Sequence, residues 1–181
     1  ILTSARAAAQ AMGEPCDAGR LELFSILLAQ LKQKSFPLRP AKTISDEAFA
    51  NFAFFEAYFS NYIEGTVFLV EEAREIVYEG NDIPLRVQDS HDIRGTYQIV
   101  SDRKAMSVTP GTGDELIELL RARHAVVLGG RPEKNPGAFK ARKNRAGDTV
   151  FVDPEFVSGT LKQRFALMAS LEDPIARAIY M

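Results

Sequence analysis

Apolar residues recur at the three- and four-residue spacing of an α-helix along almost the whole chain. Leu21, Phe24, Leu28 and Leu31 form one such stripe, and Asp17 precedes it in the position of a helix N-cap. Glycines and Asp-Pro pairs divide the pattern into short segments. Because 46% of the residues are hydrophobic, these segments can bury a sizeable core. The sequence therefore predicts a mainly α-helical fold.

The start and stop signals place the helices. We expect one over residues 1–12, one after Asp17, one over about 46–64, one that ends at Gly80, and a less regular one over 92–106. A capping box at 112–115 begins another, with Leu116, Leu119, Leu120 and Val127 on its core face. The pairs Asp153-Pro154 and Asp173-Pro174 begin the last two. Prolines flank residues 36–40, which we expect to be an extended linker.

The segment from Asp46 to Glu64 is rich in aromatic residues. It carries two stripes at helical spacing, and we therefore expect a helix that is buried on most sides. The first stripe is Phe52, Phe55, Phe59 and Ile63, and the second is Phe54, Tyr58 and Tyr62.

Only one region favours β structure. Turn signals at 136–137 and 146–148 accompany two short strand-like stretches, around Phe139 and over 149–152, which predict a hairpin within about 137–153. A basic run crosses this hairpin, and its charges either face water or hold a partner. It consists of Lys140, Arg142, Lys143 and Arg145.

Composition excludes several classes of protein. The formal net charge of −2 argues against a non-specific nucleic-acid binder. No apolar run reaches the ~18 residues of a membrane span. The single cysteine, Cys16, cannot form an internal disulfide, which fits a reducing compartment such as the cytoplasm. No histidine motif accompanies it, so the sequence does not indicate a nucleophilic thiol. His91 and His124 are too few for a metal site.

The stretch "SNYIEG", residues 60–65, ends the aromatic helix in an unusual way. Ser60 and Glu64 are one helical turn apart, so the hydroxyl can hydrogen-bond the carboxylate. Gly65 can adopt the left-handed conformation that ends a helix. The macrodipole disfavours a negative charge at this end, and we therefore expect a cationic partner for Glu64. The simpler alternative is a solvated glutamate before a common glycine cap.

"SNYIEG" also matches the (S/T)-x-x-x-E-(G/N) inhibitory motif of Fic (fido) proteins, and the chain around it resembles that family as well. The similar segments are "VEEA" (70–73), "DIRGTYQIVSDR" (92–103), "RPEKNPGAFKARKNRAGDTVFVDPEFV" (131–157) and "LEDPIARAIYM" (171–181). The resemblance covers about residues 43–181. It implies a Fic helical fold with a β-hairpin flap, and an enzyme that transfers AMP from ATP to a hydroxyl of a target protein.

One departure from the family concerns its signature, H-P-F-x-(D/E)-G-N-G-R, which is absent. In the family this segment supplies the histidine base, the phosphate-binding loop and the acidic Mg²⁺ ligand. The sequence as given therefore offers no catalytic residue and no metal ligand, and should be inactive. We expect that it stops just before the motif and that the parent protein carries it. The implied cofactors, ATP and Mg²⁺, would bind mainly to those missing groups.

The resemblance also implies roles for residues that are present. Ser60, Asn61, Glu64 and Gly65 would form the inhibitory motif, with Glu64 pairing to an arginine that otherwise holds the ATP γ-phosphate. Phe139, Lys140, Val150, Phe151 and Val152 would lie nearest a target protein that adds as a strand to the flap. Many family members also pair through helices.

We therefore expect a helical N-terminal segment over residues 1–40. The front part of a Fic domain would follow over 41–181, with the inhibitory helix at about 46–65. The alternative from another class is a catalytically inactive helical module that binds a partner protein, through the flap or by lending Glu64 to a Fic enzyme.

Overall fold

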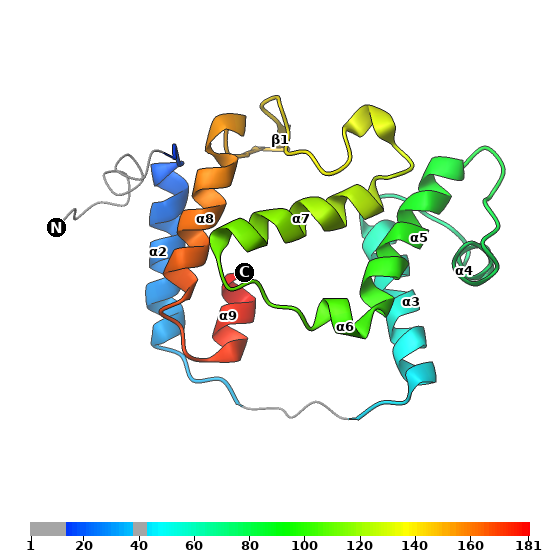
Figure 1. Ribbon diagram of the computed structural model, residues 1–181, viewed down its shortest axis with the longest axis horizontal. Helices are drawn as coiled ribbons and strands as arrows, with labels where there is room; N and C mark the ends of the chain where they lie inside the picture. The colour runs from blue at the N-terminus through cyan, green and yellow to red at the C-terminus, as the bar shows by residue number, and fades with distance from the viewer. Residues whose placement is uncertain (1–13, 38–42) are drawn as a thin grey trace. The chain divides into compact units, whose positions relative to one another are not determined.

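The computed structural model describes residues 14–37 and 43–181. They are mainly helical, with one small two-stranded sheet, which confirms the predicted fold class at that level. Figure 1 shows the helices in chain order. The predicted helix over 1–12 and most of the predicted linker over 36–40 fall outside the described residues.

The chain divides into two compact units. Among the described residues, unit 1 contains 14–37, 110–119 and 139–181, and unit 2 contains 43–109 and 120–138. The predicted division between 40 and 41 lies outside the described residues and stays a prediction. The assignment of residues 41–181 to a Fic domain stays a prediction.

In unit 1, helix α2 (Ala18–Lys32) packs against α8 (Val157–Met168) and α9 (Pro174–Tyr180). The first turns of α7 (Gly113–Val127) contribute Leu116 to the same core. The buried side chains of this core are Leu31, Leu116, Phe165, Met168, Leu171, Ala176 and Tyr180.

Sequence signals begin these helices as predicted. Asp17 caps α2, because its Oδ1 accepts the backbone N–H of Arg20 at 3.0 Å. Asp173 caps α9 in the same way and accepts from two backbone amides. A 3₁₀ turn, η3 (Pro154–Phe156), leads into α8 with proline at its first position.

Unit 2 is organised around α3 (Asp46–Ile63), which packs along α5 (Val87–Ser101). Between them come α4 (Val70–Arg74) and one π-helical turn, η1 (Glu75–Glu79), which Gly80 ends at φ +75°. After α5 come α6 (Arg103–Met106), the second part of α7 and a 3₁₀ turn, η2 (Pro132–Lys134). The core side chains are Phe54, Ala57, Phe68, Ala73, Ile76 and Ile93.

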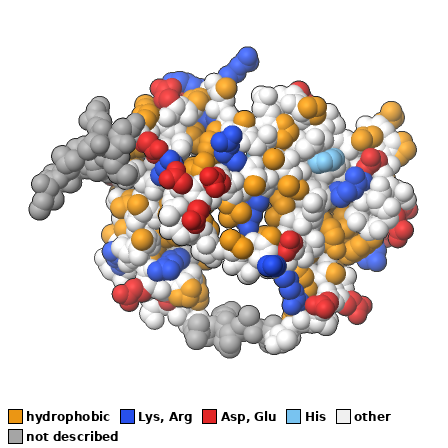
Figure 2. Space-filling model, in the orientation of Figure 1, with side chains coloured by type: hydrophobic (Ala, Val, Ile, Leu, Met, Phe, Trp, Pro, Cys, Tyr) orange, Lys and Arg blue, Asp and Glu red, His pale blue; other side chains and the backbone are white. Residues whose placement is uncertain are grey.

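The prediction that α3 is buried on most sides is wrong. Its buried side is narrow and consists of Ala53, Phe54, Ala57 and Asn61. The first aromatic stripe is instead solvent-exposed, with Phe52 at 51%, Phe55 at 43%, Phe59 at 54% and Ile63 at 82%. Tyr62 is exposed as well. Leu120 is also exposed, so its predicted position on the core face of α7 is wrong. Figure 2 shows hydrophobic side chains on the surface among charged ones.

The hairpin exists, but its first strand lies later than predicted. β1 (Arg145–Ala146) pairs antiparallel with β2 (Thr149–Val150), and Phe139 lies outside both strands. Gly147, at φ +55°, occupies the first central position of a two-residue turn, where glycine is favoured. The turn at 147–148 therefore sets the register, and the strands extend only two residues from it.

The close contact between Gly159 in α8 and the backbone at Pro15 leads to a prediction about stability. Gly159 is buried in α8 against the backbone before α2, where a Cβ added to it would overlap the carbonyl oxygen of Pro15. Gly159→Ala should therefore destabilise the protein by about 1–3 kcal/mol, as overpacking does. Urea unfolding followed by circular dichroism measures the change.

Gly19→Ala in α2 is the matched control, because its new Cβ would meet only Asp17 Oδ1 at an ordinary 3.5 Å. Alanine is the better helix former, so this variant should be neutral or up to ~1 kcal/mol more stable. Equal losses of stability in both variants would contradict the close approach.

Candidate functional site

The backbone at the end of α3 forms a complete glycine cap. Gly65 has φ +96°, its N–H donates to Tyr62 O at 3.0 Å, and the N–H of Thr66 donates to Asn61 O at 2.9 Å. These are the two hydrogen bonds of a Schellman motif. Gly65 thus ends the helix as predicted, and Glu64 is the C-cap residue.

The carboxylate of Glu64 is exposed. Among residues 14–37 and 43–181, no cationic side chain forms an ion pair with it. Ser60 contributes its carbonyl rather than its hydroxyl, by accepting the N–H of Glu64 at 3.4 Å. The negative charge therefore sits unneutralised at the negative end of a helix, which is an unfavourable position.

Asn61 fixes this helix end to its neighbour. Its side chain is 8% exposed, and its Nδ2 donates to Ala57 O at 2.9 Å and to Thr96 Oγ1 on α5 at 3.3 Å. Thr96 Oγ1 in turn donates to Asp92 O at 2.9 Å. The residues around Glu64 are thus tied to α5 on one side, while the Glu64 side chain extends into solvent.

An ion-pair network holds the first two turns of α5 in unit 2. Arg131 donates to Asp92 at 2.7 Å and to Asp89 at 2.6 Å. The hydrogen bond to Asp92, followed by the one to Asp89, raises the pKa of Arg131 above its ordinary value. Because the guanidinium is partly buried between two carboxylates, the group is structural rather than reactive.

Both histidines also have structural roles. His91 Nδ1 accepts the backbone N–H of Gly130 at 3.1 Å, and His124 Nδ1 accepts that of Gly137 at 2.9 Å. Across the described ranges, no three histidine, cysteine, aspartate or glutamate side chains gather as metal ligands, and no helix there is long and apolar enough to cross a membrane.

The predicted flap residues lie in unit 1. Val150 and Phe151 are exposed, whereas Phe139, Lys140 and Val152 are half-buried. Lys140 Nζ lies 5.6 Å from the centre of the Phe151 ring, a cation–π contact. Lys143 pairs with Asp153 at 2.6 Å, and this hydrogen bond raises the pKa of its ammonium group. Part of the basic run is therefore neutralised within the hairpin region.

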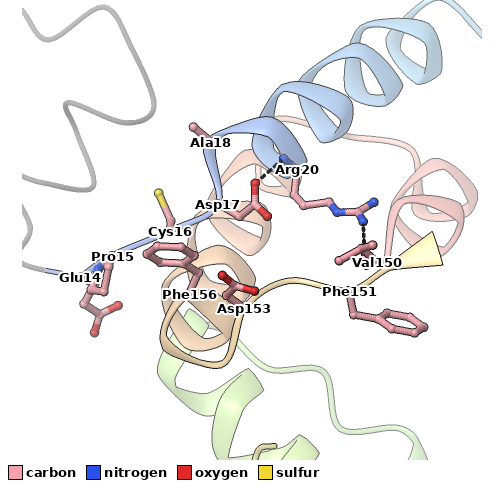
Figure 3. A pocket seen from close by; sticks show the side chains of 10 residues that line it. All are labelled: Glu14, Pro15, Cys16, Asp17, Ala18, Arg20, Val150, Phe151, Asp153 and Phe156. Carbon is pink, nitrogen blue, oxygen red and sulfur yellow. Dashed lines mark hydrogen bonds between the residues drawn. The ribbon is translucent and has the colours of Figure 1, made fainter. Parts of the chain in front are cut away.

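Sequence reasoning missed how α2 contacts the hairpin. Arg20 Nη2 donates to the carbonyl oxygen of Val150, as Figure 3 shows. Phe151 N–H donates to Asn144 O at 3.2 Å, so residues 144 and 151 are a hydrogen-bonded pair of the hairpin. Arg145 and Val150 are the neighbouring pair without such bonds, and the carbonyl of Val150 therefore points away from β1. No sequence spacing relates Arg20 to Val150, and only the tertiary fold reveals the bond.

A cavity of about 570 Å³ lies beside this contact. Figure 3 shows its walls, which come from the start of α2, from the end of β2 and from the turn before α8. Its acidic groups already have partners: Glu14 pairs with Lys162, Asp17 caps α2 and Asp153 pairs with Lys143. Burial raises the pKa of the Cys16 thiol, and the charge of Asp17 raises it further, which keeps the thiol protonated.

The anchor of the Glu64 helix end can be tested. Asn61→Ala removes the buried amide and leaves the interface with α5 without its bond to Thr96, so we expect a loss of about 1–3 kcal/mol. Asn51→Ala, at an exposed position of the same helix, is the matched control and should change stability by less than about 0.5 kcal/mol. Thermal unfolding measures both, and equal effects would contradict the anchoring role of Asn61.

None of the family models, curated proteins or solved structures compared with the chain matches it. The Fic resemblance therefore rests on the motifs in the sequence, and the roles of Ser60, Asn61, Glu64, Gly65 and the flap residues stay predictions.

Proposed function

We propose that the chain is part of a self-inhibited nucleotidyltransferase of the Fic type, which transfers AMP from ATP to a hydroxyl of a target protein. Glu64 is the inhibitory residue. One observation carries the proposal: the backbone at Glu64 is fixed by the Schellman motif, yet its carboxylate is exposed and has no cationic partner among the described residues.

The physical argument concerns the charge at the helix end. The carbonyl groups that close α3 leave a partial negative charge next to Glu64, so a cation brought to this position is attracted by both. In the proposed mechanism that cation is the arginine that otherwise binds the ATP γ-phosphate. The carboxylate neutralises the arginine and repels the phosphate, and ATP then binds with its α-phosphate misaligned for attack.

ATP and Mg²⁺ are the proposed cofactors. The groups that would hold them belong to the Fic signature, which this sequence lacks. The described residues contribute the regulation, not the chemistry of the transfer.

The flap is the proposed site for the target protein. A target segment that adds as a strand would use the outer edge of β2, near Val150, Phe151 and Val152. On that edge, the Val150 carbonyl already accepts a hydrogen bond from Arg20. A strand that pairs with Val150 would therefore replace the Arg20 hydrogen bond, so target binding and the position of Arg20 are linked in this proposal.

The second candidate is an inactive helical module that binds a partner protein. The exposed aromatic face of α3 favours it, because contiguous exposed apolar side chains often mark protein interfaces. A measurement of ATP binding by the full-length protein distinguishes the two candidates, because only the enzyme has to bind ATP.

The test compares two charge-neutralising substitutions on α3 in the full-length protein. Glu64→Gln should raise incorporation of labelled AMP from ATP by about 5–150-fold, the range of typical regulatory couplings. Glu56→Gln, at another exposed position of the helix, should leave incorporation unchanged. Equal incorporation by the wild type and Glu64→Gln would reject the inhibitory role of Glu64. Absence of ATP binding would reject the enzyme itself.

A further inference from the structure

A second, smaller cavity of unit 1 has a different character from the first. Its volume is about 280 Å³, and it lies among α2, α8 and the end of the hairpin. Most of its wall is apolar. The residues that matter here are Arg20 and Phe24 from α2, Phe151 after β2, and Leu161 and Arg164 from α8.

Two arginines line this cavity, Arg20 and Arg164. Within the described part of the chain, no side-chain carboxylate pairs with Arg20 or Arg164. Arg20 donates to the carbonyl of Val150, and Arg164 donates to the carbonyl of Tyr180. Carbonyl groups satisfy some of the donors but do not cancel the positive charges.

Arg164 lies against two aromatic rings, and one of its donors has no hydrogen-bond partner among the described residues. Its guanidinium lies 4.5 Å from the centre of the Phe24 ring and 5.7 Å from that of Tyr180. Its Nε is buried and has no hydrogen-bond partner in the structure. Burial also lowers the pKa of this guanidinium below its ordinary value.

The acidic residues nearby do not line this cavity. Asp17 and Asp153 belong to the wall of the larger cavity, which shares Arg20 and Phe151 with this one. Asp153 is paired with Lys143, and Asp17 accepts the backbone N–H of Arg20. The smaller cavity thus combines apolar walls with two positive charges and no carboxylate.

We propose that this cavity binds a small carboxylate that carries an apolar or aromatic body. The guanidinium fork matches the planar carboxylate, and burial of both groups strengthens their hydrogen bonds. The apolar walls would cover the body of the ligand. A water-sized group occupies ~30 Å³, so a cavity of this volume has room for roughly ten non-hydrogen atoms. This proposal does not rest on the AMP transfer proposed above, although Arg20 belongs to both sites.

The probe is 3-phenylpropionate, whose size suits the cavity. Isothermal titration of the full chain should show saturable binding of this acid. Its neutral analogue, 3-phenylpropanamide, has the same shape but no charge and should bind at least about tenfold more weakly, because it lacks the charge-assisted bonds. Inorganic phosphate, which has the charge without the apolar body, should bind more weakly as well.

Arginine-to-methionine substitutions test the two side chains. Arg20→Met and Arg164→Met should each weaken binding of the acid by about tenfold or more. Arg142→Met is the matched control: Arg142 is an exposed arginine of the same unit with no contact to the cavity, and its loss should leave binding unchanged. Arg164 packs on two aromatic rings, so circular dichroism must first establish that its variant is folded. If it is not, Arg20→Met decides.

Four results would overturn the proposal. They are the absence of saturable binding at millimolar 3-phenylpropionate, equal binding of the amide, binding of phosphate as tight as that of the acid, and equal losses in Arg20→Met and Arg142→Met.

Discussion

The packing of α3 on α5 is the contact on which the rest of unit 2 depends. Phe54 and Ala57 on α3 and Ile93 on α5 are at most 1% exposed, and Ala73 and Ile76 complete the same core. Burial of each of the larger side chains among them contributes about 1.5–3 kcal/mol to the stability of the fold. Asn61 adds a polar bond at the end of this interface, and the backbone before Glu64 is thereby fixed. The position of the exposed Glu64 carboxylate thus follows from an apolar contact that begins at Phe54, nearly three helical turns earlier.

Local signals in the sequence predicted where helices begin and end, but not which sides they bury. Asp17, Gly65 and Asp173 act through hydrogen bonds to neighbours in the chain, so their roles follow from the residues around them. The burial of α3 depends on what packs against it. Its two aromatic stripes have the same periodicity, but only the second one reaches the core, through Phe54 and Tyr58.

The hairpin and the cavities show the same limit. The turn at 147–148 was visible in the sequence, whereas the strand expected around Phe139 did not form, because the pairing extends only two residues from the turn. Arg20 and Arg164 meet in one cavity although they come from opposite ends of the sequence. Their shared cavity could not be predicted from the sequence, because neither arginine belongs to a motif and only the tertiary structure brings them together.

The composition of unit 1 also constrains the order in which the protein folds. Thr160 Oγ1 accepts the backbone N–H of Asp17 at 2.9 Å, so the start of α2 is bonded to a residue made much later during synthesis. Unit 2 draws on residues 41–109 and 120–138, which leave the ribosome before residues 139–181. Unit 2 can therefore be completed during translation, whereas α2 waits with its apolar side unpaired until α8 has emerged. During that interval, Leu21 and Leu31, which the finished fold buries, stay accessible to water.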